Sequence, residues 1–193
     1  KNTSLNYKKV LIALFFGVIF VGLTSLMRVL MKKNKFSGII SKINRAPDFC
    51  RSWLLTKAFC SKVKFADTTG IRILEVSNQQ VTIALENKKK VQNHIGGVHA
   101  VAAAVIAESA TGIVFGMNLR DSSLPLLKTM KTSYVRRMQG AISAKATLTE
   151  QQIADIQSLD KGEMIIDFVI TDESGQEPIE SEMTWAWIPK DRK

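Results

Sequence analysis

The stretch that decides the fold covers residues 93–117 and reads NHIGGVHAVAAAVIAESATGIVFGM. Its second part, residues 99–117, is rich in alanine and free of proline, a composition that favours a helix. The segment is apolar on nearly every side, so we expect the helix to be buried. Glu108 is its single charge.

Strand patterns lie on both sides of this helix. Residues 71–76 and 81–86 precede it with a turn at 77–79, and the second strand alternates apolar and polar side chains. Four strand candidates follow the helix: 128–137, 141–148, 163–172 and 182–188. Gly140 and Ser174-Gly175 mark two tight turns, and a capping box at 149–152 predicts a short helix. Met183, Trp185 and Trp187 share one face of the last strand, as core residues do. This order predicts an α+β fold in which a curled antiparallel sheet wraps one long central helix.

Asn93, His99 and Glu108 give the chain a resemblance to the hotdog-fold acyl-CoA thioesterases. In those families an Asn in a glycine-bearing loop precedes a His at the start of the central helix, and a carboxylate lies nine residues after that His. Here the steps are six and nine residues. Residues 69–189 follow the family's element order, and the loop NHIGGVHA is most similar to an uncharacterised branch. The resemblance implies a hotdog fold, a homodimer or higher homo-oligomer, and no cofactor.

The residue types suit thioester hydrolysis. A helix N-terminus presents unpaired N–H groups, so Ala100 offers an oxyanion donor, although related enzymes usually have Gly there. Gly96 and Gly97 give the loop the backbone freedom to reach a ligand. Glu108 is the expected base or nucleophile, in a site that related enzymes often complete from the opposite subunit. Asn93 is expected to position water or the thioester.

Simpler interpretations stand beside these roles. Glu108 also fits a structural, hydrogen-bonded carboxylate. His99 fits a helix-entry residue that orients the loop as well as a catalytic base. His94 fits a solvated loop residue. The run Lys88-Lys89-Lys90 fits a solvated surface or a contact with CoA phosphates.

The positive charge of the chain gathers around an apolar N-terminal segment. Residues 1–35 hold seven basic and no acidic residues, which leaves a net charge of +3 for the rest of the chain. Residues 10–27 are uncharged and, as a helix of about 1.5 Å per residue, nearly span a hydrocarbon core of about 30 Å. We expect a retained single-pass membrane anchor; a cleaved signal or organellar targeting segment and a buried soluble helix are the alternatives. The heavier basic flank follows the segment, which predicts a cytosolic domain.

Three parts and three functions follow from these patterns. The parts are an anchor with basic flanks (1–35), a helical connector (36–68) and a hotdog domain (69–193). The connector holds Cys50 and Cys60, which we interpret as reduced thiols with no metal site. The first function is hydrolysis of acyl-CoA or another acyl thioester by a membrane-tethered enzyme; the second is non-catalytic binding of an acyl thioester or lipid; the third is a dimerisation scaffold. The charge distribution favours a membrane partner over nucleic acid.

Overall fold

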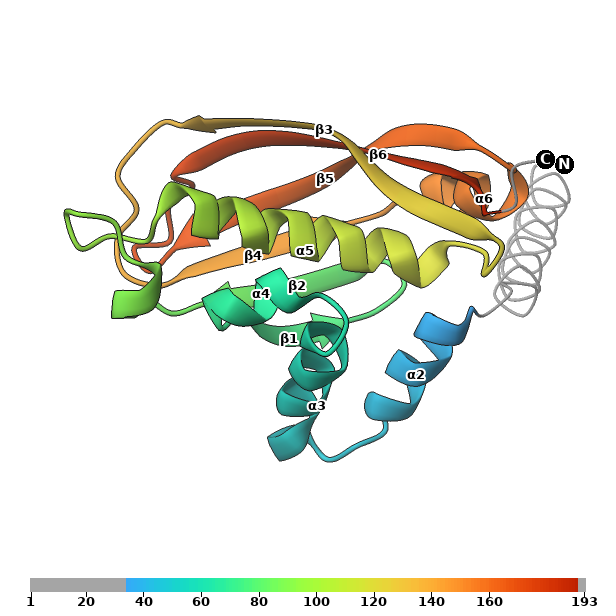
Figure 1. Ribbon diagram of the computed structural model, residues 1–193, viewed down its shortest axis with the longest axis horizontal. Helices are drawn as coiled ribbons and strands as arrows, with labels where there is room; N and C mark the ends of the chain where they lie inside the picture. The colour runs from blue at the N-terminus through green and yellow to red at the C-terminus, as the bar shows by residue number, and fades with distance from the viewer. Residues whose placement is uncertain (1–33, 191–193) are drawn as a thin grey trace, which may run out of the picture. The chain divides into compact units, whose positions relative to one another are not determined.

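The computed structural model describes residues 34–190, so the predicted anchor at residues 10–27 lies outside the described residues. Six strands form one antiparallel sheet that curls around the helix α5 (Ala100–Asn118), as Figure 1 shows. The strands are β1 (Arg72–Val76), β2 (Gln80–Leu85), β3 (Ser123–Tyr134), β4 (Ile142–Thr147), β5 (Gly162–Asp172) and β6 (Ile179–Pro189). Their spatial order is β1-β2-β4-β5-β6-β3, which places β1 and β3 at the edges. The predicted α+β architecture is confirmed.

The helix α5 is the centre of the core, as its composition predicts. Thirteen of its 19 residues are buried. Phe115 contacts Trp185 and Trp187 of β6 with ring centroids 5.6 and 5.9 Å apart. The Trp185 indole donates a hydrogen bond to Thr111 at 3.0 Å, and a Cβ on Gly112 would lie 2.9 Å from the same ring. Among the described residues α5 is long and apolar enough to cross a membrane, but 67% of that window is buried inside the protein.

The edge strand β3 departs from its predicted limits. The alternation predicts residues 128–137, whereas the strand runs over Ser123–Tyr134 and includes Pro125. A proline lacks a backbone donor and is tolerated where a strand pairs on one side only. Elsewhere the local signals hold: Thr149 and Gln152 form the predicted capping box at the start of α6 (Glu150–Ser158).

A buried carboxylate organises the turns beyond β3 and β5. Asp172 accepts hydrogen bonds from the backbone N–H groups of Gln139 and Ser174, both at 3.0 Å, and Arg136 lies 3.6 Å away. Burial by itself would raise the pKa of Asp172, but hydrogen bonds from Ser174, Gln139 and Gln176 outweigh it and hold the pKa below its ordinary value. These bonds tie the loop before β4 to the turn between β5 and β6.

Three helices precede the sheet: α2 (Lys35–Ile43), α3 (Asp48–Cys60) and α4 (Lys64–Thr69). Pro47 is the residue just before α3 and occupies its N-cap position. The helix α3 is fixed on β1 because Ser52 donates to the Ile73 carbonyl at 2.7 Å and Thr56 accepts from the Ile73 N–H at 2.9 Å. A short 3-10 helix, η1 (Lys89–Val91), connects β2 to the loop before α5.

The first described residue, Asn34, is held against the far end of α5. Its amide donates to the Gly116 carbonyl at 2.7 Å and also to the Leu119 carbonyl. The side-chain oxygen accepts from the Ser37 N–H at 2.6 Å and caps α2. One side chain therefore satisfies carbonyl groups at the C-terminal end of the core helix and fixes where the chain enters the described fold.

Candidate functional site

The loop before α5 is shaped by the side chain of Asn93. Its oxygen accepts from the N–H groups of Ile95 and Gly97, both at 3.1 Å, while its own backbone N–H donates to the Gly97 carbonyl at 2.8 Å. Gly96 has φ +77°, a left-handed conformation that an L side chain rarely adopts. The turn therefore uses the Asn93 oxygen internally and leaves the amide nitrogen as the group with which Asn93 can meet a ligand.

His99 is the N-cap of α5. Its ring atom Nδ1 accepts from the Val101 N–H at 3.1 Å, and its backbone N–H donates to the Val91 carbonyl at 2.7 Å. The next residue, Ala100, is the first of the helix, so the helix itself provides no acceptor for its N–H. The geometry gives His99 the helix-entry role and leaves an N–H donor at a positive helix end.

Glu108 lies on the one stripe of α5 that is not fully buried. Ala104, Glu108 and Gly112 are spaced four residues apart and are each partly accessible. Within residues 34–190, the Glu108 carboxylate forms no ion pair and accepts no hydrogen bond. Burial raises the pKa of Glu108, and no charged neighbour offsets this effect. A half-buried carboxylate without a partner in this part of the chain binds a proton more readily than an exposed glutamate, which makes Glu108 a candidate acid–base group.

The structure groups some of the predicted site residues and separates another. Asn93, Gly96, Gly97, His99 and Ala100 share one end of α5. Glu108 is eight residues beyond Ala100, about 12 Å along the helix axis at about 1.5 Å per residue. Within one chain, therefore, the helix end and the carboxylate do not converge on one carbonyl group.

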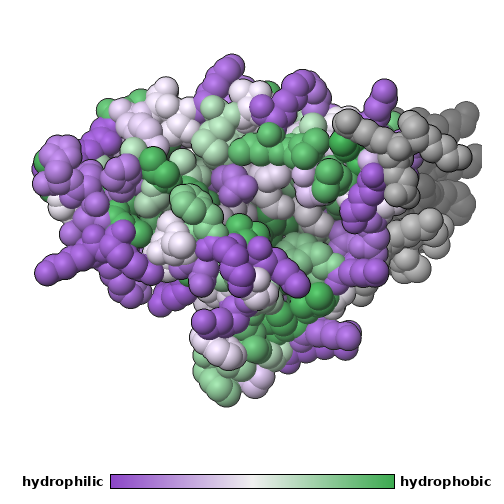
Figure 2. Space-filling model, in the orientation of Figure 1, coloured by the Kyte–Doolittle hydropathy of each residue, from purple (hydrophilic) through white to green (hydrophobic). Residues whose placement is uncertain are grey.

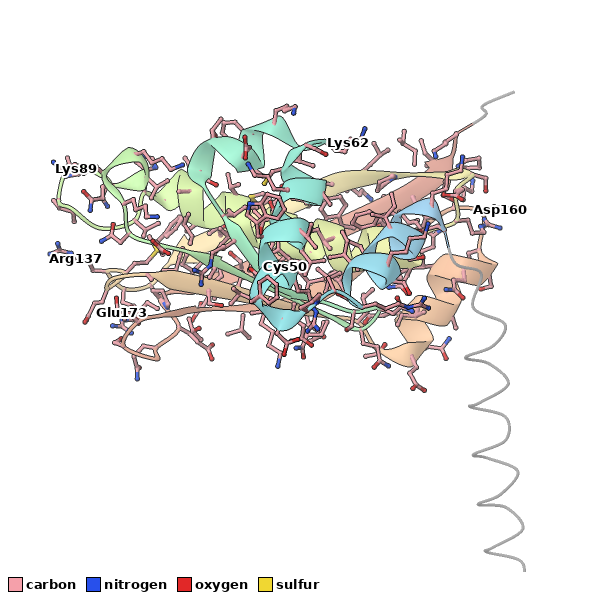
Figure 3. The ribbon with its side chains drawn as sticks, turned by 90° about the horizontal axis from the view of Figure 1, so that it is seen from below. Cys50, Lys62, Lys89, Arg137, Asp160 and Glu173 are labelled. Atoms are coloured by element: carbon pink, nitrogen blue, oxygen red, sulfur yellow. The ribbon has the colours of Figure 1, made fainter. Side chains whose placement is uncertain are left out.

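Two polar residues beside the helix end were not indicated by the sequence. Tyr134, the last residue of β3, donates from its hydroxyl to the Ala100 carbonyl at 2.6 Å, and burial raises its pKa. Arg137 donates to the Ile95 carbonyl at 2.8 Å and crosses from the β3 side to the loop. Figure 3 shows Arg137 at the same end of the molecule as Lys89. No periodic pattern marks either residue, because both contacts join segments that are distant from each other in the chain.

The cysteines and the other potential metal-ligating side chains are dispersed over the described residues. Over the part of the chain that the structure describes, no three His, Cys, Asp or Glu side chains form a metal-binding group. Cys50 and Cys60 are free thiols in α3, and burial raises the pKa of Cys60. A raised pKa keeps that thiol protonated and unreactive.

A long helix inside a curled six-stranded antiparallel sheet, with an asparagine-shaped turn at its N-terminus, defines a hotdog-fold domain. More narrowly, the chain belongs to the family described as "Domain of unknown function (DUF4442)", which matches residues 51–188. This family is the uncharacterised hotdog-like branch that the loop sequence indicates. No curated protein matches the chain.

Solved structures with the same fold carry thioesterase names. A Pseudomonas aeruginosa protein of unknown function, called a probable thioesterase, is 23% identical, with a TM-score of 0.64 over 70% of this chain and 94% of its own. A thioesterase from Haemophilus influenzae is 15% identical, with a TM-score of 0.57 over 69% and 87%. A Staphylococcus aureus thioesterase is 19% identical, with a TM-score of 0.56 over 65% and 99%. At these identities the similarity establishes the fold alone.

Proposed function

We propose that this chain hydrolyses acyl thioesters of the acyl-CoA type, with Glu108 as the catalytic carboxylate. The observation that carries the proposal is the Glu108 side chain itself: half-buried, unpaired among the described residues, and raised in pKa by burial. An uncompensated carboxylate in a core helix costs free energy, and a catalytic role gives a reason for that cost.

The helix geometry supports a site shared between two copies. The Ala100 N–H and Glu108 of one chain lie about 12 Å apart along α5, too far to act on one carbonyl group. A two-fold axis perpendicular to α5 and level with Ala104, midway between Ala100 and Glu108, would set two such helices antiparallel and bring Glu108 of the partner subunit to the Ala100 end of the first. The exposed edge strand β3, with Leu124, Leu126 and Met130 partly accessible, supports a homodimer because two edges can pair and extend the sheet.

The proposed reaction uses groups that the fold already orients. The Ala100 N–H, at the positive end of α5, receives the developing oxyanion of the thioester carbonyl. Glu108 of the partner subunit takes a proton from water as the water oxygen attacks the carbonyl carbon. The tetrahedral intermediate collapses, the carbon–sulfur bond breaks, and the products are a carboxylic acid and a thiol. The Asn93 amide nitrogen positions the water or the substrate carbonyl.

The spacing of the site residues agrees with one of the similar proteins. Two solved variants of the Staphylococcus aureus chain replace a glutamine and a glutamate with alanine. The glutamate follows the glutamine in that chain by the same number of positions as Glu108 follows Asn93 here. The agreement supports a pairing of an amide side chain with a carboxylate, one on the loop and one on the helix.

Basic side chains near the loop support a phosphorylated carrier such as CoA. Lys88 forms an ion pair with Glu86 at 2.8 Å. Lys89 and Arg137 lie at the same end of the domain in Figure 3, and Lys90 is the residue after Lys89. Phosphate groups bind clustered cations of this kind. A protein acyl carrier also presents a phosphate group. The substrate screen therefore has to distinguish acyl-CoA from an acylated carrier protein.

A non-catalytic acyl-thioester or lipid-binding module is the second candidate. The observation in its favour is Ala100, at a position where the related thioesterases usually have Gly. A Cβ at the helix entrance narrows the approach of a carbonyl group to the N–H donor. Binding would then use the same end of α5 without turnover.

The deciding experiment is a thioesterase screen of the full chain over acyl-CoA chain lengths, with release of free thiol as the readout. Hydrolysis of at least one acyl-CoA is the expected result. Binding of acyl-CoA without thiol release at any chain length would replace the enzyme by the binding module. Failure of both binding and hydrolysis would leave the scaffold interpretation.

The membrane tether is a separate part of the proposal. Its support is the uncharged run at residues 10–27 with basic flanks. We expect the full chain to stay in the pellet when membranes are extracted with alkaline carbonate. Release into the supernatant would count against a spanning segment.

A further inference from the structure

The helices α2, α3 and α4 expose large apolar and basic side chains together. These helices form the lobe that projects from the sheet in Figure 1, and Figure 2 shows green apolar patches over this lobe with purple hydrophilic side chains between them. We use the name helical face for nine of its exposed basic and large apolar residues: Lys35, Ile39, Lys42, Arg45, Phe49, Trp53, Lys57, Lys64 and Phe65. None of them belongs to the candidate site at the N-terminus of α5.

The packing of α3 determines which side it presents outward. Its inner side is bonded to β1 through Ser52 and Thr56. Phe49, Trp53 and Lys57 follow one another at four-residue steps and so form one stripe, roughly a quarter turn around the helix from Ser52 and Thr56 at about 100° per residue. Phe49 is 90% exposed and Trp53 is 61% exposed. Aromatic side chains this exposed are unusual on a surface that meets only water.

The neighbouring helices also expose basic and apolar side chains. In α2, Ser37 and Ile40 are buried, while Lys35, Ile39 and Lys42 lie on the outer side. In α4, Ala66 and Thr69 are buried, while Lys64 and the 64%-exposed Phe65 lie outside. Figure 3 looks onto these helices, with Cys50 of α3 and Lys62 between α3 and α4 labelled.

The charges of the described residues are divided between the helices and the hotdog domain. Residues 34–70 hold seven basic and two acidic side chains, a net charge of +5. Residues 71–190 hold 12 basic and 14 acidic side chains, a net charge of −2. Arg51 is the one cation of the helices that forms an ion pair, with Asp48, among the ion pairs within residues 34–190. The helical face is therefore complementary to an anionic surface.

We propose that the helical face docks on the surface of an anionic lipid bilayer, with Phe49 and Trp53 in the headgroup region and the surrounding lysines and arginines on lipid phosphates. Tryptophan and phenylalanine favour this interfacial zone, and clustered basic residues favour anionic leaflets. Four residues separate the two aromatic side chains, about 6 Å along the axis of α3, so one bilayer surface can contact both.

The position of the face in the chain favours lipid over a protein partner. Asn34, which is bonded to the end of α5, begins the described fold, and only residues 28–33 separate it from the uncharged run at residues 10–27. An extended linker of this length reaches about 20 Å at most. If that run enters a bilayer, α2 starts within this distance of the lipid. Docking of the helical face does not require residues 10–27 to enter the bilayer, because its positive charge and exposed aromatic side chains are attracted to an anionic lipid surface independently.

The tryptophan content of the chain provides a direct test. The chain has three tryptophans; Trp53 is exposed, whereas Trp185 and Trp187 are buried in the core. The full chain is reconstituted with vesicles whose acyl chains carry bromine, either neutral or with about a third of anionic lipid. We expect quenching of fluorescence in anionic vesicles, and loss of that quenching in Trp53→Phe. Quenching should weaken in neutral vesicles and at 1 M salt, where the Debye length falls to about 3 Å.

Matched charge variants test the basic residues. Lys42→Glu with Arg45→Glu should lower the partition of the face onto anionic vesicles at least tenfold, since each cation contributes about a fivefold preference. Lys145→Glu with Lys161→Glu makes the same change in net charge at exposed positions outside the helical face and should leave quenching unchanged. Equal quenching in neutral and anionic vesicles, or equal quenching in Trp53→Phe, would overturn the proposal. A Trp53 shielded from both brominated lipid and aqueous acrylamide would also overturn it, because a second copy or a protein would then cover the face.

Discussion

Replacement of Glu108 by Gln distinguishes a catalytic carboxylate from a structural one, because a catalytic role predicts lower activity together with higher stability at neutral pH. Gln keeps the size of the side chain and removes its ability to take a proton. General-base catalysis typically contributes about 10²–10⁴ in rate. At about 1.36 kcal/mol per tenfold change, kcat should fall by an equivalent of about 2.7–5.4 kcal/mol in activation free energy, while acyl-CoA affinity is retained.

The stability of the same variant should move the other way. Burial raises the pKa of Glu108 in the folded state, so its contribution favours folding below the unfolded pKa of about 4.3 and is lost as the pH rises through the folded value. At pH 7 to 8 the ionised carboxylate therefore destabilises the fold, and Glu108→Gln should be more stable than the parent. Towards pH 4 the difference should vanish. A carboxylate held by structural hydrogen bonds predicts a loss of stability instead.

The assay pairs thiol release with thermal unfolding from pH 4 to pH 8. The parent's kcat should rise with pH through an inflection above the ordinary range of a glutamate. Glu177→Gln, which removes an exposed carboxylate in the β5–β6 turn, is the matched control and should change neither measurement. Full activity in Glu108→Gln, or a lower unfolding temperature at pH 8, would refute the assignment.

Three further outcomes follow from the described contacts. Asp172→Asn should lose about 3 kcal/mol of unfolding free energy at pH 7, because its NH2 group must face the N–H of either Gln139 or Ser174, which bond to different oxygens of the carboxylate. Since the folded pKa of Asp172 is lowered, the parent's advantage in urea unfolding should be complete above about pH 4 and disappear as the pH falls through the folded value. Gly112→Ala should cost about 1–3 kcal/mol in the same assay, because its Cβ would press on Trp185; an unchanged midpoint would mean that the indole moves freely. Light scattering of the full chain in detergent should give at least a dimer after correction for bound detergent, and a monomer would remove the shared-site mechanism.

Several features of the fold were readable from short segments. The buried helix follows from an apolar, alanine-rich run with a single charge, and the capping box of Thr149 and Gln152 follows from a four-residue motif. The loop before α5 is also local, since Asn93 bonds to residues two and four positions later. The limits of β3 were not readable, because Pro125 argues against a strand until its place at a sheet edge is known.

The site divides in the same way. Asn93, His99, Ala100 and Glu108 were named from their types and spacing, but their mutual distances are properties of a rigid rod of about 1.5 Å per residue. The helix separates Glu108 from its own N-terminal end, so a site that uses both groups requires two copies of the chain. Tyr134 could be assigned to the candidate site only from the tertiary structure, in which the end of β3 lies beside Ala100.

The sequence by itself determined which segments bury an apolar surface, where the helix begins, which carboxylate is isolated, and where positive charge gathers. These properties depend on residue type and on periods of 3.6 and 2, so they survive without knowledge of distant neighbours. The tertiary structure alone decided that β3 crosses to the edge beside β6, that Asn34 closes the far end of α5, and that Phe49 and Trp53 face outward. Each of these results depends on which surfaces come into contact after the chain closes long loops. The free energy of such non-local contacts cannot be predicted from a short sequence pattern.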